Sequence, residues 1–292
     1  MSVSAITDSP SIGDPTVGSS THALANGGTT LPEKQTDSNH DHLLEQIEQT
    51  MDLIAEATSP ARVEEAVVDI SVIVPVFNER QTLPNIIERL HQVMPVSTEI
   101  IVIDDASYDG TTQWLEDQSQ TDKFRVIHRR ANHGKGSAVR LGIRHSRGRV
   151  VAIQDADLEY DPADLLRVIW PVLDGNAEAA YGSRYLDGQD RSILGSAVNR
   201  TLTALSNRIT GLRLTDMETC HKAFEGDLIR GMDLREPRFG FEPEVTSKLA
   251  ASDAMILEVP TRYERRSYAE GKKIQWRDGI EALACMWRYR NG

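Results

Sequence analysis

The chain has 292 residues, 39% of them hydrophobic and 26% charged, and a formal net charge of −12. These values are typical of a globular protein with one large α/β domain or two modest ones. No apolar run approaches the ~18 residues that a membrane helix needs, and no signal peptide opens the chain, so we expect no transmembrane segment. The two cysteines, Cys220 and Cys285, lie far apart and match no zinc or redox spacing. They indicate a reducing compartment, and we expect the protein in the cytoplasm.

The charge is unevenly distributed along the chain. Residues 1–69 hold twelve acidic and two basic side chains, whereas residues 123–149 hold nine basic side chains and no acidic one. Residues 1–39, rich in Ser, Thr, Gly and Pro, are predicted to be a disordered arm. Residues 40–68 are predicted to be an amphipathic helix and linker. The globular domain is then residues 69–292, whose small net charge and few aromatic residues argue against nucleic acid as a partner.

A regular alternation of strands and helices begins at residue 69. ISVIVPV predicts a strand buried on both faces, and residues 83–93 predict a helix. The strands EIIVID, FRVIHR and VVAIQ then alternate with the helices TTQWLEDQ, SAVRLGIRHS and ADLLRVIWPVL. This alternation predicts an α/β fold with a mostly parallel sheet and helices on both faces. Ligands bind such sheets beyond the carboxyl ends of the strands.

Polar side chains directly follow each of these four strands, and capping or turn formation would explain any one of them alone. They are Asn78 and Glu79, then Asp104 and Asp105, then Lys135, and finally Asp155, Asp157 and Glu159. Because parallel strands end at one edge of a sheet, we expect these groups to lie close together. The basic stretch beside them favours an anionic ligand held together with a metal.

The stretch QDADLEYDP carries the most specific chemistry. If the chain stays extended after Ile153, the carboxylates of Asp155, Asp157 and Glu159 project to the same side. Crowded carboxylates repel one another unless a cation neutralises them, and Mg²⁺ or Mn²⁺ prefers oxygen ligands and bridges to phosphates. The pattern suits metal-assisted departure of a diphosphate. Asp161, directly before a proline, is expected to cap the next helix.

Five motifs together resemble family 2 glycosyltransferases of the GT-A, Rossmann-type fold, and are most similar to dolichyl- and polyprenyl-phosphate sugar synthases. VPVFNE, IVIDDASYDGT, NHGKGSA, QDADLEYDP and YGSRY occur in the family's order over roughly residues 69–280. The resemblance implies that the nucleotide sugar is bound by Pro75, Asn78, Glu79, Asp105, Lys135, Asp155 and Ala156. It implies metal ligation by Asp155, Asp157 and Glu159, the last standing where relatives have Gln. It places Arg184 at a donor or acceptor phosphate.

The second half of the chain is expected to bind the acceptor. By the resemblance, Arg266 and Lys272 of RRSYAEGKK would grip phosphate, although Ala269 and Gly271 depart from the family's pattern. A solvated basic hairpin is the alternative. A phosphate acceptor is already ionised and needs no base, whereas a sugar hydroxyl needs a carboxylate. Asp216 and Glu218 are the candidates for that base, and Asp216 could equally orient the acceptor.

The activity implied is that of a metal-dependent, inverting hexosyltransferase. It would move a hexose from a UDP-glucose or GDP-mannose type donor to a polyprenyl or dolichyl phosphate, with Asp157, Asp216 and Arg184 as catalytic residues. The alternatives are a cytosolic glycosyltransferase with a soluble hydroxyl acceptor and a catalytically silent nucleotide-binding scaffold. The segment IEALACMWRYR either contacts the cytoplasmic face of a membrane peripherally or is the last packed helix. PVFNER lacks the glycines of a dinucleotide-dependent oxidoreductase.

Overall fold

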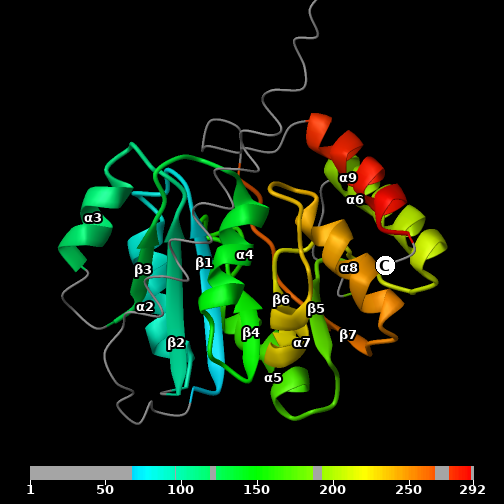
Figure 1. Ribbon diagram of the computed structural model, residues 1–292, viewed down its shortest axis with the longest axis horizontal. Coiled ribbons are helices and arrows are strands. Elements are labelled where there is room, and N and C mark those ends of the chain that lie inside the picture. Colours follow the sequence, from blue (N-terminus) through cyan, green and yellow to red (C-terminus); the bar gives the residue numbers. More distant parts are fainter. Residues whose placement is uncertain (1–67, 96, 119–122, 187–192, 267–275, 291–292) are drawn as a thin grey trace, which may run out of the picture. The chain divides into compact units, whose positions relative to one another are not determined.

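The computed structural model describes residues 68–95, 97–118, 123–186, 193–266 and 276–290 (Figure 1). The predicted arm over residues 1–39 and nearly all of the predicted helix and linker over 40–68 lie outside the described residues. The strands are β1 (Ile70–Val76), β2 (Thr98–Asp104), β3 (Arg125–His128), β4 (Val150–Ile153), β5 (Ala179–Ser183), β6 (Lys222–Glu225) and β7 (Ile256–Pro260). The helices are α2 (Leu83–Val93), α3 (Thr111–Gln118), α4 (Lys135–His145), α5 (Pro162–Leu173), α6 (Ile193–Thr210), α7 (Gly226–Gly231), α8 (Phe241–Ala251) and α9 (Trp276–Arg288).

The described strands form one mixed sheet in the order β3-β2-β1-β4-β6-β5-β7. Strands β3, β2, β1 and β4 pair in parallel, and β5 pairs in parallel with β7. Strand β6 is antiparallel to both of its neighbours, β4 and β5. The predicted α/β fold with a mostly parallel sheet is therefore confirmed. The reversed strand in its middle was not predicted.

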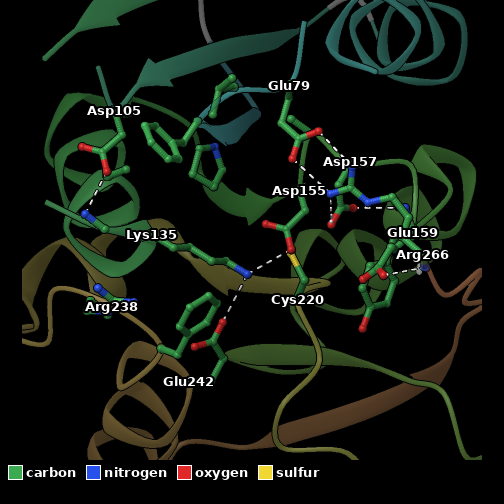
Figure 2. Close-up of a pocket in the computed structure, with 18 of the residues that line it drawn as sticks. Glu79, Asp105, Lys135, Asp155, Asp157, Glu159, Cys220, Arg238, Glu242 and Arg266 are labelled. Carbon is green, nitrogen blue, oxygen red and sulfur yellow. Dashed lines mark hydrogen bonds and ion pairs between the residues drawn. The ribbon is translucent and has the colours of Figure 1, made fainter. Parts of the chain in front are cut away.

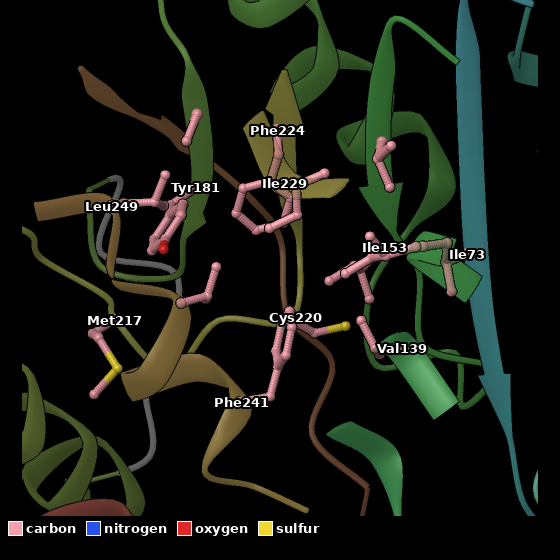
Figure 3. Packing of buried hydrophobic residues seen from close by; sticks show 14 of the residues in the cluster. Ile73, Val139, Ile153, Tyr181, Met217, Cys220, Phe224, Ile229, Phe241 and Leu249 are labelled. Carbon is pink, nitrogen blue, oxygen red and sulfur yellow. The ribbon is translucent and has the colours of Figure 1, made fainter. Parts of the chain in front are cut away.

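Hydrophobic side chains cover both faces of the sheet. In β1, Val72 and Val74 pack with α2, α3 and α5 on one face, while Ile73 packs with α4 on the other. This alternation follows from the two-residue period of a strand, and it explains why a strand buried on both faces is apolar almost throughout. The cluster on the α4 face extends to Tyr181 and Phe224 (Figure 3). This hydrophobic cluster holds β4, β5 and β6 in place, and residues next to the ends of these strands line the cavity described below.

Helices α6, α8 and α9 pack on one another, and Figure 1 shows them grouped beyond β5. On α9, Cys285 and Met286 are buried, and the Cys285 thiol donates to the Gly240 carbonyl oxygen at 3.2 Å. The segment IEALACMWRYR is therefore a packed helix of the domain, although Trp287 is 67% exposed. Within the described part of the chain, no helix combines the length and apolarity that crossing a membrane would require.

Candidate active site

A cavity of about 350 Å³ lies at the carboxyl edge of the sheet. Its walls come from the loops after β1, β2, β4, β5 and β7 and from the start of α4, as the parallel pairing predicts. The segment before β6 also reaches it, because the reversed β6 places its first residue, Lys222, opposite Ile153 at the end of β4. Glu218 and Cys220 thus line the cavity, although they precede a strand. Figure 2 shows the residues gathered around it.

Two glycines hold Lys135 at the cavity. A Cβ atom on Gly136 would lie 2.4 Å from the Glu236 carbonyl oxygen, and Gly134 has a φ of +93°. Only glycine allows this approach, and the Ser137 amide then donates to the Pro237 carbonyl oxygen at 2.8 Å. The glycine-flanked loop is thereby clamped on the segment before α8. Lys135 begins α4 facing the cavity.

Asp105 lines the cavity and also holds this loop. Its carboxylate accepts from the backbone N–H of Gly134 at 2.8 Å and pairs with Arg129 at 3.1 Å. Burial raises the pKa of Asp105 despite these donors. Asn78, predicted to contact the nucleotide, is not among the lining residues. Its side-chain oxygen accepts from the Tyr108 amide at 2.9 Å, so it positions the loop after β2.

The chain does not stay extended after Ile153, so that expectation was wrong. Residues 156–160 turn, Leu158 has a φ of +62°, and the Asp157 carboxylate accepts from the Glu159 amide at 3.0 Å. Aspartate favours such a turn because its side chain bonds to the backbone two residues later. The three carboxylates of Asp155, Asp157 and Glu159 nevertheless all line the cavity, together with Pro75, Glu79 and Ala156.

Each of these carboxylates has a partner. Lys135 Nζ lies 3.0 Å from Asp155 and 3.3 Å from Glu242. Burial favours a neutral Asp155, but the Lys135 ammonium outweighs it and lowers the Asp155 pKa. On the other side, Arg266 lies 3.3 Å from Asp157. Burial and the charges of Asp155 and Glu159 raise the pKa of Asp157 to about 7. The site thus carries more negative charge than its cations neutralise.

Arg266 also connects this region to the first loop. Its two terminal nitrogens donate to Glu79 at 3.0 Å each, and its backbone amide donates to Glu159 at 2.8 Å. The Tyr263 hydroxyl donates to the other Glu159 oxygen at 2.8 Å. The predicted phosphate residue Arg266 therefore reaches the cavity. Lys272 lies outside the described residues.

Asp216 is buried and does not line the cavity. It accepts from Arg184 Nε and Nη2 at 2.6 Å each, a bidentate pair that leaves Arg184 5% exposed and Asp216 0% exposed. Arg184 itself lines the cavity. The geometry therefore favours an orienting role for Asp216 over that of a base. Glu218 does line the cavity, and burial together with the Glu242 charge raises its pKa to about 8.

The family model of glycosyl transferase family 2 matches residues 71–230 of this chain. The chain belongs to glycosyltransferase family 2. An undecaprenyl-phosphate mannosyltransferase of Micrococcus luteus is 31% identical over 212 residues, covering 68% of this chain and 85% of that protein. A polyprenol monophosphomannose synthase of Mycolicibacterium smegmatis is 28% identical over 212 residues, covering 69% and 79%. The predicted family and enzyme class are therefore confirmed.

Solved structures support the GT-A-like fold of this glycosyltransferase. Glucosyl-3-phosphoglycerate synthase of Mycobacterium tuberculosis, in complex with Mn²⁺, UDP and glucosyl-3-phosphoglycerate, superposes with a TM-score of 0.59. The superposed region covers 79% of this chain and 86% of the synthase chain, at 19% sequence identity. A further structure of that enzyme contains Mg²⁺ and UDP, with a TM-score of 0.59.

The carboxylates of the glycosyltransferase fit a hard divalent cation in their chemistry. Among the described residues, no group of three or more His, Cys, Asp or Glu side chains is arranged to hold one metal ion. Mg²⁺ often uses only one or two carboxylates together with substrate phosphates. Asp157, whose pKa is raised by burial and by the charges of Asp155 and Glu159, and its neighbour Asp155 suit such a shared site, because a cation would neutralise the crowded carboxylates. Glu159 already accepts hydrogen bonds at both oxygens.

Several lining residues were not predicted. They are Asn132, Tyr160, Arg238, Phe239 and Tyr263. Tyr263 follows β7, so the rule that ligand residues follow strands would have found it once β7 was recognised. Arg238 and Phe239 precede a helix, and only the clash at Gly136 reveals that their loop closes over the start of α4. Cys220 was interpreted as a buried small residue; it is buried, and it also lines the cavity next to Asp155 (Figure 2).

Proposed function

We propose that this glycosyltransferase moves a hexose from a nucleotide sugar to a polyprenyl phosphate with the help of Mg²⁺ or Mn²⁺. The observation that carries the proposal is one cavity that combines the Asp155 and Asp157 carboxylates with two arginines, Arg184 and Arg266. Carboxylates suit a metal-bound diphosphate, and guanidinium groups suit phosphate oxygens. The two bacterial relatives, named for undecaprenyl phosphate and polyprenol, support the acceptor class.

The reaction would be a single displacement at the anomeric carbon. A phosphate oxygen of the acceptor forms the new C–O bond, while the bond to the diphosphate oxygen breaks and the nucleoside diphosphate leaves with the electron pair. Attack from the opposite face inverts the configuration. The acceptor phosphate is ionised at neutral pH, so no side chain has to remove a proton. This agrees with Asp216 being fully engaged by Arg184.

The chain's own residues would position both substrates. Arg184, fixed by Asp216, and Arg266, which reaches from the loop after β7, would bind phosphate oxygens. When bound, the metal would neutralise charge on the leaving diphosphate, with Asp155 and Asp157 as its protein ligands. Glu79 and Lys135 would face the nucleotide. The catalytic domain is proposed to span residues 69–292, because the cavity residues run from Pro75 to Arg266.

The acceptor class makes a prediction about location. A polyprenyl phosphate lies in a membrane, so the enzyme would have to contact a membrane surface to reach it. That contact, like a cytoplasmic location, stays a prediction.

The decisive experiment measures thermal unfolding of the full chain with UDP, GDP and their hexose conjugates, each with and without Mn²⁺. A ligand that binds only the folded state at 100 times its Kd stabilises it by about 2.7 kcal/mol. We expect a metal-dependent shift with one nucleotide, and no such shift for Asp157→Ala. The exposed Asp117→Ala serves as the matched control and should behave as the unmodified chain.

A transfer assay with polyprenyl phosphate then separates the alternatives. Turnover with polyprenyl phosphate supports the proposal. Turnover only with a soluble hydroxyl acceptor contradicts it and favours a glycosyltransferase that acts on soluble acceptors. Donor binding without turnover on either acceptor contradicts it as well and favours a silent nucleotide-binding scaffold.

A further inference from the structure

Three side-chain oxygen atoms of the cavity lining lack a hydrogen-bond partner within the described part of the chain. They are Glu218 Oε1, Glu242 Oε2 and the Tyr160 hydroxyl, and each is shielded from solvent. Buried polar side-chain atoms are nearly always hydrogen-bonded in proteins, so an unpartnered group in a cavity indicates a ligand or water. Two of the three belong to carboxyl groups, which accept hydrogen bonds when ionised and can both accept and donate when protonated.

The nearby cations are engaged elsewhere. Lys135 bonds Asp155 and lies near the other Glu242 oxygen, at 3.3 Å. Lys222 donates to the carbonyl oxygens of Met217 and Thr219 and lies 4.3 Å from the centre of the Tyr181 ring. Arg184 is held by Asp216. The free carboxylate oxygens therefore remain available to a ligand that donates hydrogen bonds.

The charge around these oxygens disfavours an anionic ligand. Three carboxylates, those of Asp155, Glu218 and Glu242, lie near the ammonium groups of Lys135 and Lys222, while the nearby Arg184 is already paired with Asp216. The crowding is visible in Glu218, whose pKa rises to about 8 through burial and through the charge of Glu242. A further negative charge placed here would be repelled, whereas neutral hydroxyl groups would satisfy the unpartnered oxygens.

The position of Glu218 and Glu242 in the cavity suits the sugar of the donor. Figure 2 shows Glu242 across the cavity from Glu79 and Asp157, with Lys135 and Asp155 between them. Under the proposed function, on which this inference rests, the diphosphate lies near Asp157 and the arginines. The transferred sugar would then extend toward Glu242 and Glu218.

We propose that Glu218 and Glu242 form a sugar-reading wall, which accepts hydrogen bonds from hydroxyl groups of the transferred sugar and selects neutral sugars over those that carry a carboxylate. A site built around a substrate hydroxyl discriminates strongly against an analogue that lacks it, because its buried polar groups are then left unpaired. The Tyr160 hydroxyl adds a group that can donate as well as accept.

The test compares kcat/KM for UDP-glucose or GDP-mannose, whichever the enzyme uses, with the corresponding deoxy-sugar donors and with the uronate of the same donor, UDP-glucuronate or GDP-mannuronate. The variants are Glu218→Gln and Glu242→Gln, with the exposed Glu264→Gln, which does not line the cavity, as the matched control. We expect each cavity variant to lose about 10–100-fold in kcat/KM for the hexose donor. The loss in kcat/KM should be smaller for the deoxy donor that lacks the hydroxyl group bound by the substituted glutamate. Binding of UDP or GDP alone should be unchanged.

The outcomes separate this inference from the function on which it rests. If the unmodified enzyme transfers hexose but both cavity variants match Glu264→Gln on every donor, the sugar-reading wall is refuted and the proposed function stands. Equal use of the hexose donor and of the uronate with the same nucleotide also refutes it. Loss of UDP or GDP binding in the variants indicates a structural role and counts against the inference. If the unmodified enzyme binds no nucleotide sugar, both proposals fail.

Discussion

Replacing Asp216 by alanine removes the partner of a buried guanidinium group. Arg184 is 5% exposed, and its Nε and Nη2 each donate to Asp216 at 2.6 Å. Removing one member of a buried ion pair costs about 3–5 kcal/mol, because the other charge is left uncompensated away from water. For a chain of this size, each kcal/mol lowers Tm by roughly 2–4 °C. We therefore expect Asp216→Ala to lower Tm by about 6–20 °C.

Thermal and urea-induced unfolding of the purified chain measure this effect. The matched control is Asp227→Ala, which breaks a pair with Arg230 of 2.7 Å in which the Asp227 side chain is 90% exposed. Exposed pairs contribute about 0–1 kcal/mol, so the control should change Tm little. A loss of less than about 1 kcal/mol in Asp216→Ala would refute the reasoning. Asp216→Asn that retains stability but loses turnover with a flattened pH profile would restore Asp216 as a base.

Three further predictions follow from buried contacts. Burial lowers the pKa of His221 to about 4, so between pH 6.5 and 4 the unfolded chain binds a proton that the folded chain does not. The free energy of unfolding should therefore decrease by up to about 3 kcal/mol as the pH is lowered from 6.5 to 4. Urea melts of His221→Gln should lack this dependence on pH. Gly136→Ala places a Cβ 2.4 Å from the Glu236 carbonyl oxygen and should cost about 1–3 kcal/mol in urea unfolding, whereas Gly231→Ala, with nothing within 4 Å, should not. Arg266→Ala should raise the KM for a phosphate acceptor by about 10–100-fold; an unchanged KM would favour the solvated hairpin.

The first half of the fold could be predicted from the sequence because its signals are local. The run ISVIVPV coincides with β1, and the predicted helix over residues 83–93 coincides with α2. Asp161 caps α5, accepting from the Ala163 amide at 3.0 Å, as its position before Pro162 indicates. Strand β6, with four residues, was not predicted, since its direction depends on pairing with β4 and β5 rather than on its own sequence.

The candidate site divides in the same way. Glu79, Asp105, Lys135 and Asp157 line the cavity because they follow parallel strands. The rule that ligand-binding residues follow the ends of parallel strands could not place Glu218, which precedes an antiparallel strand. The burial of Asp216 depends on tertiary packing, which no sequence spacing reveals. The turn at Asp157 was missed because its cause, a side chain bonding to its own backbone, competes with the extended conformation that the preceding strand suggests.

The strand order also decides when the sheet can be completed as the chain leaves the ribosome. Once residue 153 has emerged, β1 to β4 can pair, but the outer side of β4 stays open until β6 at residues 222–225 arrives. Strand β5 is made earlier but has no place of its own beside β4, because β6 must insert between them. For about seventy residues of synthesis, roughly 4–14 s at 5–20 residues per second, one edge of the apolar strand β4 is unpaired. Nascent chains that stall in this interval should be the ones that aggregate.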